Sequence, residues 1–297
     1  MPVHMLSEHA GYIPGAVNIG VIVGASNTCA MIDTGLNDSN ARKALKAIEQ
    51  DLALPVTTII NTHGHADHFG GNAFVVKRTG ASVWAPEVDE ATIRYPVLQP
   101  TMLFAGADPL EAMRRGFLLA EPSPVDVVFG PGPLEFEGVK IDGVALKGHS
   151  PGQTGLLIDE VFFCADVVLP PTVLEKYKIP YLYSVSEHIL SLERALYTTC
   201  KWAVPGHGEV TNSLRESIGM NQRIVSQVSS FIVDSLPTPK PAEQLFVEVL
   251  RHFDAPVDNP SAYFLLHPTI YAFLSHLERL GEVGLLFDDR QLLWQRV

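Results

Sequence analysis

Four potential metal ligands within six residues constrain this chain more than any other feature. They are His63, His65, Asp67 and His68, and they follow the apolar run 56–60, which predicts a buried strand. Imidazole and carboxylate groups suit zinc, iron or manganese. Side chains alternate along an extended loop, so His68 can turn towards a second position while the other three point one way. The spacing predicts two metal ions, with a polar loop of chance histidines as the simpler alternative.

This string resembles the HxHxDH signature of the metallo-β-lactamase superfamily, which includes glyoxalase II, lactonases, ribonucleases and flavodiiron proteins. That family also carries a third histidine, a bridging aspartate and a last histidine further along. The chain has His149 in Gly-His-Ser-Pro-Gly, Asp166 after an apolar run, and His207 in Pro-Gly-His-Gly. The resemblance covers residues 12–208. It implies an α/β fold, a four-layer αββα metallo-β-lactamase sandwich.

The resemblance also implies a division of seven ligands between two divalent ions, with zinc preferred and iron or manganese as alternatives. One metal would be held by His63, His65 and His149, the other by Asp67, His68 and His207, with Asp166 bridging them. Two cations lower the pKa of a shared water and so supply a metal-bridging hydroxide as the nucleophile. Asp67 or Asp166 would then move a proton to the leaving group.

Asp33 is the candidate supporting residue, because it ends a predicted strand in Ile-Asp-Thr-Gly. In the resembled family an aspartate at this place hydrogen-bonds a ligand histidine. A helix cap or a turn carboxylate is the alternative. The family often has a further histidine where this chain has Gln153, at a position that is not a ligand. His188 matches no ligand motif, and we expect it to be a packing or helix-surface histidine.

The predicted elements place the ligand loops at strand ends. Strands are expected at 16–23, 28–32, 56–60, 82–85, 125–129, 134–136, 139–146, 156–158, 161–164 and 202–204. Helices are expected at 38–50, capped by Asp38 and Ser39, at 69–79, and at 186–200, capped by Ser186. Sites of α/β proteins open at the carboxyl ends of such strands.

Residues 87–122 form a longer connection than the sheet requires, with prolines interrupting an apolar, partly helical stretch. Such a segment near a metal site is a candidate lid or substrate wall. A helix pair packed on the sheet or across a dimer contact is equally compatible with the sequence.

The loop 167–183 follows the bridging aspartate and contains Lys176, Tyr181 and Tyr183. These three side chains could bind an anionic or carbonyl group of a substrate, or could be solvated loop residues.

We expect two domains. Residues 1–212 would form the catalytic domain, including the insertion at about 87–122, and residues 213–297 a small C-terminal domain of helices at 214–236, 242–252 and 268–280 and a hairpin at 283–295. This order resembles a winged-helix module. Residues 240–297 contain five Lys or Arg against eight Asp or Glu, so no basic face for nucleic acid is expected. A packing or dimerisation role is preferred, which makes a homodimer compatible with the sequence, and a wall of the substrate pocket is the alternative.

Composition narrows the class of protein further. The chain of 297 residues is 46% hydrophobic, which suits a globular protein, and its net charge of -12 argues against a nucleic-acid partner. Three scattered cysteines do not make a disulfide framework, and neither a signal peptide nor a membrane-spanning run is recognisable. We therefore expect a cytoplasmic protein with no membrane partner.

Hydrolysis of a thioester or other acyl ester, as in the glyoxalase II-like branch, is the first functional expectation. The sequence contexts of His149 and His207 resemble that branch, and the partner would be a small-molecule acyl substrate. Gly208-Glu-Val lacks the aromatic residue often found there, so a lactonase is close behind. A phosphodiesterase or ribonuclease is disfavoured by the acidic charge. A di-iron redox centre, which would need a flavin domain, and a non-catalytic metal-binding protein are the alternatives from other classes.

Overall fold

Residues 2–297 are described by a computed structural model, in which two β-sheets face each other. The first sheet contains, in order, β1 (His4–Met5), β2 (Ala10–Ile13), β3 (Ile19–Val23), β4 (Cys29–Ile32), β5 (Val56–Ile60), β6 (Ser82–Pro86) and β7 (Val127–Phe129). The second contains β12 (Trp202–Pro205), β11 (Val161–Ala165), β10 (Thr154–Ile158), β9 (Val139–Ala145) and β8 (Gly132–Phe136). The strands β1 and β2 were not predicted from the sequence.

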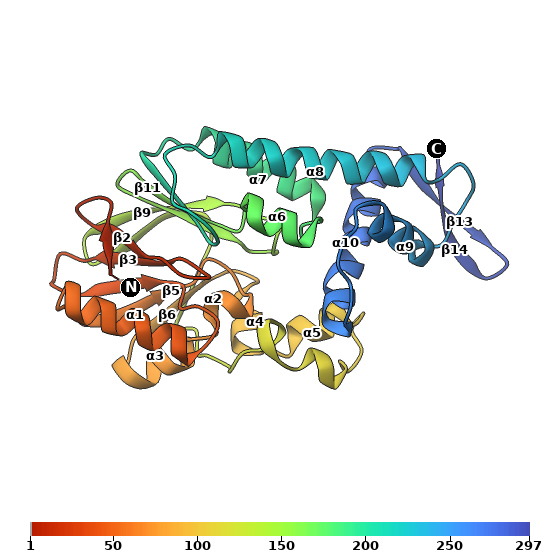
Figure 1. The fold of residues 1–297 in the computed structure, drawn as a ribbon. Helices are drawn as coiled ribbons and strands as arrows, with labels where there is room; N and C mark the ends of the chain where they lie inside the picture. Colours follow the sequence, from red (N-terminus) through yellow and green to blue (C-terminus); the bar gives the residue numbers. More distant parts are fainter. Residues whose placement is uncertain (1) are drawn as a thin grey trace.

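Helices cover both outer faces, because each sheet has apolar side chains on both of its surfaces. α1 (Asp38–Asp51) and α3 (Asn72–Thr79) pack on the first sheet, and α7 (Val185–Tyr197) and the beginning of α8 (Arg215–Asp234) pack on the second. Between the sheets, Ile32 and Ile60 share a buried cluster with Phe163. This is the four-layer αββα sandwich that the sequence predicted (Figure 1).

Parallel pairing gathers the site-bearing loops. β4 and β5 run parallel in the first sheet, and β11 and β12 run parallel in the second. Asp33 directly follows β4, and the loop with His63 follows β5. Asp166 directly follows β11, and His207 follows β12. Since carboxyl ends of parallel strands meet at one edge of a sheet, four of the functional segments converge at one edge of the sandwich.

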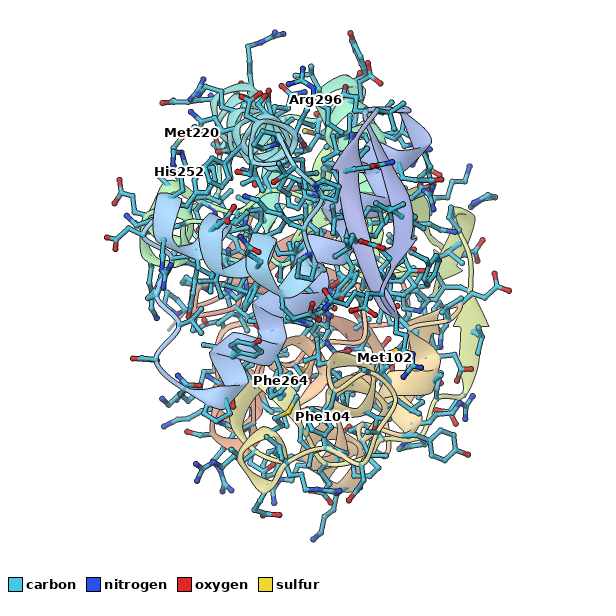
Figure 2. All side chains as sticks on the ribbon, turned by 90° about the vertical axis from the view of Figure 1, so that its right-hand side faces the viewer. Met102, Phe104, Met220, His252, Phe264 and Arg296 are labelled. Carbon is cyan, nitrogen blue, oxygen red and sulfur yellow. The ribbon has the colours of Figure 1, made fainter. Side chains whose placement is uncertain are left out.

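The insertion packs against the C-terminal part of the same chain. It contains α4 (Glu90–Arg94), α5 (Leu98–Leu103), η1 (Glu111–Met113) and η2 (Gly116–Leu118). Leu103, Met113 and Leu118 form a small buried cluster that Phe264 of α10 (Pro260–Arg279) adjoins. The rings of Phe104 and Phe264 meet edge to face with centroids 4.9 Å apart (Figure 2).

One hydrophobic cluster unites the C-terminal elements, which are the end of α8, α9 (Ala242–His252), α10, β13 (Val283–Asp288) and β14 (Gln291–Arg296). α8 passes from the sandwich into this cluster, with Ile218 in one and Val225 in the other (Figure 1). Ile179 and Leu182, which precede residue 212, also belong to it. The C-terminal elements are thus continuous with the sandwich, and the division at 212 stays a prediction.

Several element boundaries differ from the sequence prediction. α10 begins at Pro260 and not at 268, because Asn259 accepts a hydrogen bond from the Ala262 amide and Pro260 suits the first turn, whereas Pro268 lies inside the helix. The helix predicted at 69–79 is α3, which begins three residues later, at Asn72. A separate short helix, α2 (Ala66–Phe69), lies in the segment predicted as the metal loop. α2 does not continue into α3, and the His68 carbonyl accepts from the Thr34 amide at 2.7 Å.

Two caps and one loop were also predicted wrongly. The N-cap of α1 is Asn37, whose side chain accepts from two backbone amides, and that of α7 is Ser184. The segment 167–183 contains α6 (Pro171–Tyr177), which the prolines obscured although a proline in the first turn favours a helix. Among residues 2–297, no helix combines the length and the apolar character needed to span a bilayer.

Candidate metal centre

All seven candidate ligands lie together at the edge where the strand ends meet. They form three overlapping groups whose ligand atoms lie within 4.8 Å of one another: His63, His65 and His149; His63, His68 and Asp166; and Asp67, His68 and His207. The shared members, His63 and His68, join the groups into one cluster. The side chains come from loops of both sheets, so closure of the sandwich assembles the cluster.

Four of the five histidines use Nδ1 for a partner outside the cluster and leave Nε2 for the inside. The partners are Thr62 Oγ1 for His63 (3.0 Å), the Asp33 carboxylate for His68 (2.8 Å), the Tyr181 carbonyl for His149 (3.2 Å) and the Ala16 carbonyl for His207 (2.7 Å). Metal-binding histidines characteristically donate their second ring N–H in this way.

Several buried ligand atoms at the centre of the cluster lack hydrogen-bond partners within residues 2–297, as expected where a metal ion would bind. Nε2 of His63, Nε2 of His68 and Oδ1 of Asp166 are buried without a hydrogen-bond partner among the described residues. Nδ1 of His65 points at Nε2 of His149 across 2.9 Å. A buried polar atom left without a partner costs about 1–3 kcal/mol. Nitrogen and carboxylate donors turned towards each other in this way fit divalent cations.

The two aspartates occupy different positions in the cluster. Oδ2 of Asp166 lies 3.4 Å from Nε2 of both His149 and His207, and its Oδ1 lies 3.5 Å from Nε2 of His68. Asp166 is therefore central and its side chain is only 5% exposed. Oδ2 of Asp67 lies 3.4 Å from Nε2 of His207, and its side chain is 29% exposed. Asp67 thus lies on the open side of the cluster.

Burial keeps three of the histidines neutral. It lowers the pKa of His63 well below the ordinary value, and the neighbouring His68 and His65 lower it further. Burial also lowers the pKa of His65 to about 4, against the opposing effect of Asp67. The pKa of His149 falls to about 4 for the same reason, with His65 adding to the effect. A neutral imidazole is the form that binds metal.

The other two histidines face the carboxylates. The charge of Asp166 raises the pKa of His207 to about 10, although burial opposes the rise. Burial would lower the pKa of His68, but Asp166 and Asp33 together raise it well above the ordinary value. Burial alone would raise the pKa of Asp67, yet His68 and His207 lower it to about 2. In the absence of metal, positive imidazoles thus balance the negative carboxylates.

The candidate supporting residue Asp33 lies under the ligand loop. Its carboxylate accepts from Nδ1 of His68, and also from the backbone amide (2.8 Å) and hydroxyl (2.7 Å) of Thr62. Because His63 bonds to the same hydroxyl, Asp33 contacts one histidine directly and a second through Thr62. Asp33 also has a positive φ of 61°, a conformation that is uncommon outside glycine and concentrates at functional sites.

The three candidate substrate-binding residues are placed differently. The ring of Tyr181 lies 5.6 Å from that of His65 and 5.8 Å from that of His149. Burial raises the pKa of its hydroxyl to about 12, although the nearby Gln99 side chain opposes the rise. Lys176 is exposed on α6, with its ammonium over the ring of Tyr177, and Tyr183 is 57% exposed. Of the three, the structure brings Tyr181 to the cluster.

Sequence reasoning gave no role to two residues that hold ligand loops in place. The side chain of Asn18 donates to the carbonyls of Pro205 and Gly208, on either side of the loop that carries His207. Gln153 donates to the Leu146 carbonyl and accepts from the Asp166 amide, so it connects two further loops. Asn18 lies in no recognisable motif, and Gln153 was noted only as a position that is not a ligand, so the contacts of both are revealed by the folded structure.

Comparison with known sequences decides the family. The sequence model of the Metallo-beta-lactamase superfamily matches residues 12–207, which contain every residue of the cluster. The chain belongs to this superfamily. Members of the metallo-β-lactamase superfamily are metal-dependent hydrolases that usually use zinc. The His/Asp cluster is therefore the candidate site at which this chain would bind metal.

Individual relatives are distant. "Metallo-beta-lactamase type 2" from Bacteroides fragilis is 26% identical over 215 residues, which are 70% of this chain and 75% of that protein. "Hydroxyacylglutathione hydrolase" from Albidiferax ferrireducens is 34% identical over 82 residues, 28% of this chain and 29% of that one. The crystal structure of a beta-lactamase domain protein from Burkholderia ambifaria covers 100% of this chain and 96% of its own, with a TM-score of 0.76 and 17% identity. Its fold is thus similar over the whole length.

Proposed function

We propose that this protein is a binuclear, zinc-dependent hydrolase of a thioester or another acyl ester. The observation that carries the proposal is the orientation of the ligand atoms. Four histidines bond outwards through Nδ1, and buried atoms of His63, His68 and Asp166 at the centre have no hydrogen-bond partner among the described residues. A structural polar network would satisfy these atoms with hydrogen bonds.

Two sets of side chains would hold the metals. His63, His65 and His149 form one set, Asp67, His68 and His207 form the other, and Asp166 lies between them. Divalent cations bound there would lower the pKa of water and polarise the acyl carbonyl of the substrate. The protein keeps these ligands fixed through the outward Nδ1 bonds, so little reorganisation accompanies binding.

Asp166 would fix the positions of the histidines, and Asp67 would transfer a proton. Asp166 is central and nearly inaccessible, which suits a residue that fixes the two histidine groups relative to each other. Asp67 is partly exposed on the open side, so its carboxyl group can accept a proton and pass it to a leaving group. No nucleophilic serine or cysteine is needed for this reaction.

Two features support an acyl substrate. The relative named for hydroxyacylglutathione hydrolysis shares 34% identity over 82 residues. Tyr181 also lies against His65 and His149 and belongs to the apolar cluster of the insertion, so an apolar acyl group bound beside Tyr181 would lie close to the metal ligands.

We further propose that residues 213–297 form a C-terminal domain that supports the insertion through α10.

β-Lactam hydrolysis is the second candidate, because the relative named as a metallo-β-lactamase covers 70% of the chain at 26% identity. It breaks an amide in a strained ring, where the leaving nitrogen needs a proton more than a thiolate does. A lactone substrate would require the same carbonyl chemistry. These candidates differ in the bond that is cleaved, while the cluster would act in the same way.

The experiment is a substrate panel on zinc-loaded protein. Thioesters of glutathione and of a simple thiol, a lactone, a β-lactam and a phosphodiester are compared at equal concentration. We expect the highest kcat/KM with a thioester, and a fall of about 10²-fold or more in Asp166→Ala, as for loss of a metal ligand. A higher kcat/KM for the β-lactam would replace the first candidate by the second, and activity unaffected by Asp166→Ala would contradict both.

A further inference from the structure

One buried carboxylate joins the two loops that carry His65 and His149. Asp89 follows β6 at the beginning of the insertion and is only 2% exposed. Its Oδ2 accepts from the Gly64 amide at 3.1 Å and from the hydroxyl of Ser150. Its Oδ1 accepts from the Gly152 amide at 2.9 Å. Gly64 directly precedes His65, and Ser150 directly follows His149.

The two loops need such a connection because they belong to different sheets. The loop with Gly64 extends β5 of the first sheet, whereas His149 lies between β9 and β10 of the second. A backbone hydrogen bond from the Thr154 amide to the Thr62 carbonyl, 3.0 Å long, also links them. Asp89 adds three bonds from a third segment, and these lie immediately beside the two histidines.

Backbone packing around Asp89 is unusually close. A methyl group added at Gly64 would overlap the Thr92 hydroxyl and approach the Asp89 carbonyl to 2.7 Å. One added at Gly152 would overlap the Glu87 carbonyl and lie 3.2 Å from Cγ of Asp89. The Thr92 hydroxyl also donates to the Gly64 carbonyl at 3.0 Å. Residues 87–92 therefore fit tightly between the loops, and a displacement of Asp89 would displace both.

We propose that Asp89 is a positioning residue that sets the distance between His65 and His149, and with it the affinity of that half of the centre for a divalent metal. The inference rests on the proposed metal centre. Burying a carboxylate is unfavourable unless hydrogen bonds compensate for lost hydration. Burial raises the pKa of the Asp89 carboxyl, and the three donors from the two histidine loops offset part of that effect. Since Asp89 also begins the insertion, it connects the insertion to the metal ligands.

The test is zinc binding by graded variants, without any substrate. Asp89→Ala removes all three bonds, Ser150→Ala removes one, and Asp89→Asn keeps the volume but offers one acceptor oxygen. Zinc Kd is measured by competition with a chelator, and the visible spectrum of the cobalt-substituted protein reports ligand geometry. We expect Asp89→Ala to weaken zinc binding by about 10- to 100-fold and to change the cobalt spectrum, with smaller effects in the other two variants.

Asp126→Ala is the matched control, because Asp126 accepts a hydrogen bond from the Val83 amide at the opposite end of β6. It should lower the Tm of the metal-free protein without changing zinc Kd. If Asp89→Ala and Ser150→Ala lower Tm but bind zinc with the wild-type Kd and cobalt spectrum, Asp89 is a structural residue and the inference is wrong. If Asp89→Ala does not fold, the Kd of Ser150→Ala decides in the same way. Failure of the wild type to bind zinc would instead contradict the proposed metal centre and this inference with it.

Discussion

The Asp33 carboxylate accepts a hydrogen bond from Nδ1 of His68 at 2.8 Å, and both groups are almost completely buried. This contact holds the His68 ring with Nε2 towards Asp166. Asp33→Ala should therefore weaken zinc binding by about 10- to 100-fold, as loss of a supporting carboxylate does in other metal sites. Chelator competition on the purified variant measures the change.

Asp51→Ala is a suitable control for Asp33→Ala, because Asp51 also accepts a backbone hydrogen bond, from Val3, but is exposed at the end of α1. Its zinc Kd should equal that of the wild type. An Asp33→Ala protein that binds zinc as tightly as the Asp51→Ala protein would show that His68 needs no such support.

Metal binding should release protons unequally from the two ligand sets. His207, with a pKa raised to about 10 by Asp166, is protonated at pH 7.5 in the metal-free protein, and the pKa of His68 is raised in the same direction by Asp166 and Asp33 against the effect of burial. His65 and His149, whose pKa values fall to about 4, are already neutral. Ligating imidazoles must lose their protons, so zinc affinity should rise with pH from 7 towards 10.

Calorimetry in buffers of different ionisation enthalpy counts the released protons. His207→Gln should reduce the count by about one at pH 7.5, because it removes a group that is charged before binding and neutral afterwards. His65→Gln should leave the count unchanged, since that imidazole binds without losing a proton. Equal counts for both variants would contradict the assigned charges.

The partly exposed position of Asp67 predicts a dependence on the leaving group. Asp67→Asn should lower kcat for alkyl thioesters by about 10²–10⁴-fold, the range expected for loss of proton transfer, if enough metal remains bound. For aryl thioesters, whose thiolates leave without a proton, the loss should be much smaller. Activities divided by measured zinc content separate this effect from metal loss, and equal losses for both substrates would exclude proton transfer by Asp67.

The contact between the insertion and α10 predicts a local effect on stability. Phe264→Ala removes the ring that meets Phe104 edge to face, an arrangement that contributes about 0.5–1.5 kcal/mol beyond burial. Residues 98–118 should then exchange their amide hydrogens faster, while β5 and β11 remain protected. Phe287→Ala, at a 77% exposed ring of the C-terminal hairpin, is the control and should leave exchange in 98–118 unchanged. Uniform faster exchange throughout would mean that Phe264 stabilises the whole fold and not the insertion.

The resemblance to the superfamily implied the sandwich and the grouping of the seven cluster residues, and that resemblance rests on short local motifs. A ligand loop after an apolar run and histidines in glycine-rich contexts are readable from the chain alone. The residues that hold the loops together are not readable in this way. Asn18 contacts a loop 187 residues away, and Asp89 contacts Ser150 across 61. Such contacts exist only after both sheets have packed.

The start of α10 was predicted wrongly because it also depends on tertiary contacts that the sequence does not show. Proline and glycine signals were read as interruptions, yet Pro260 begins α10 and Pro268 lies within it. The tertiary contacts of α10 with the insertion outweigh the local preference of one proline. The packing of the insertion on α10 could not be predicted either, because Phe264, which contacts Phe104, follows the insertion by about half the chain length.

The number of zinc ions bound per chain tests the account most directly. Protein freed of metal, loaded with zinc and dialysed against buffer is measured by mass spectrometry of the native protein, together with Asp166→Asn. We predict two zinc ions in the wild type and fewer in the variant, with thioester hydrolysis following occupancy. A wild-type protein that retains less than one zinc ion per chain, or that hydrolyses thioesters equally well without metal, would contradict it.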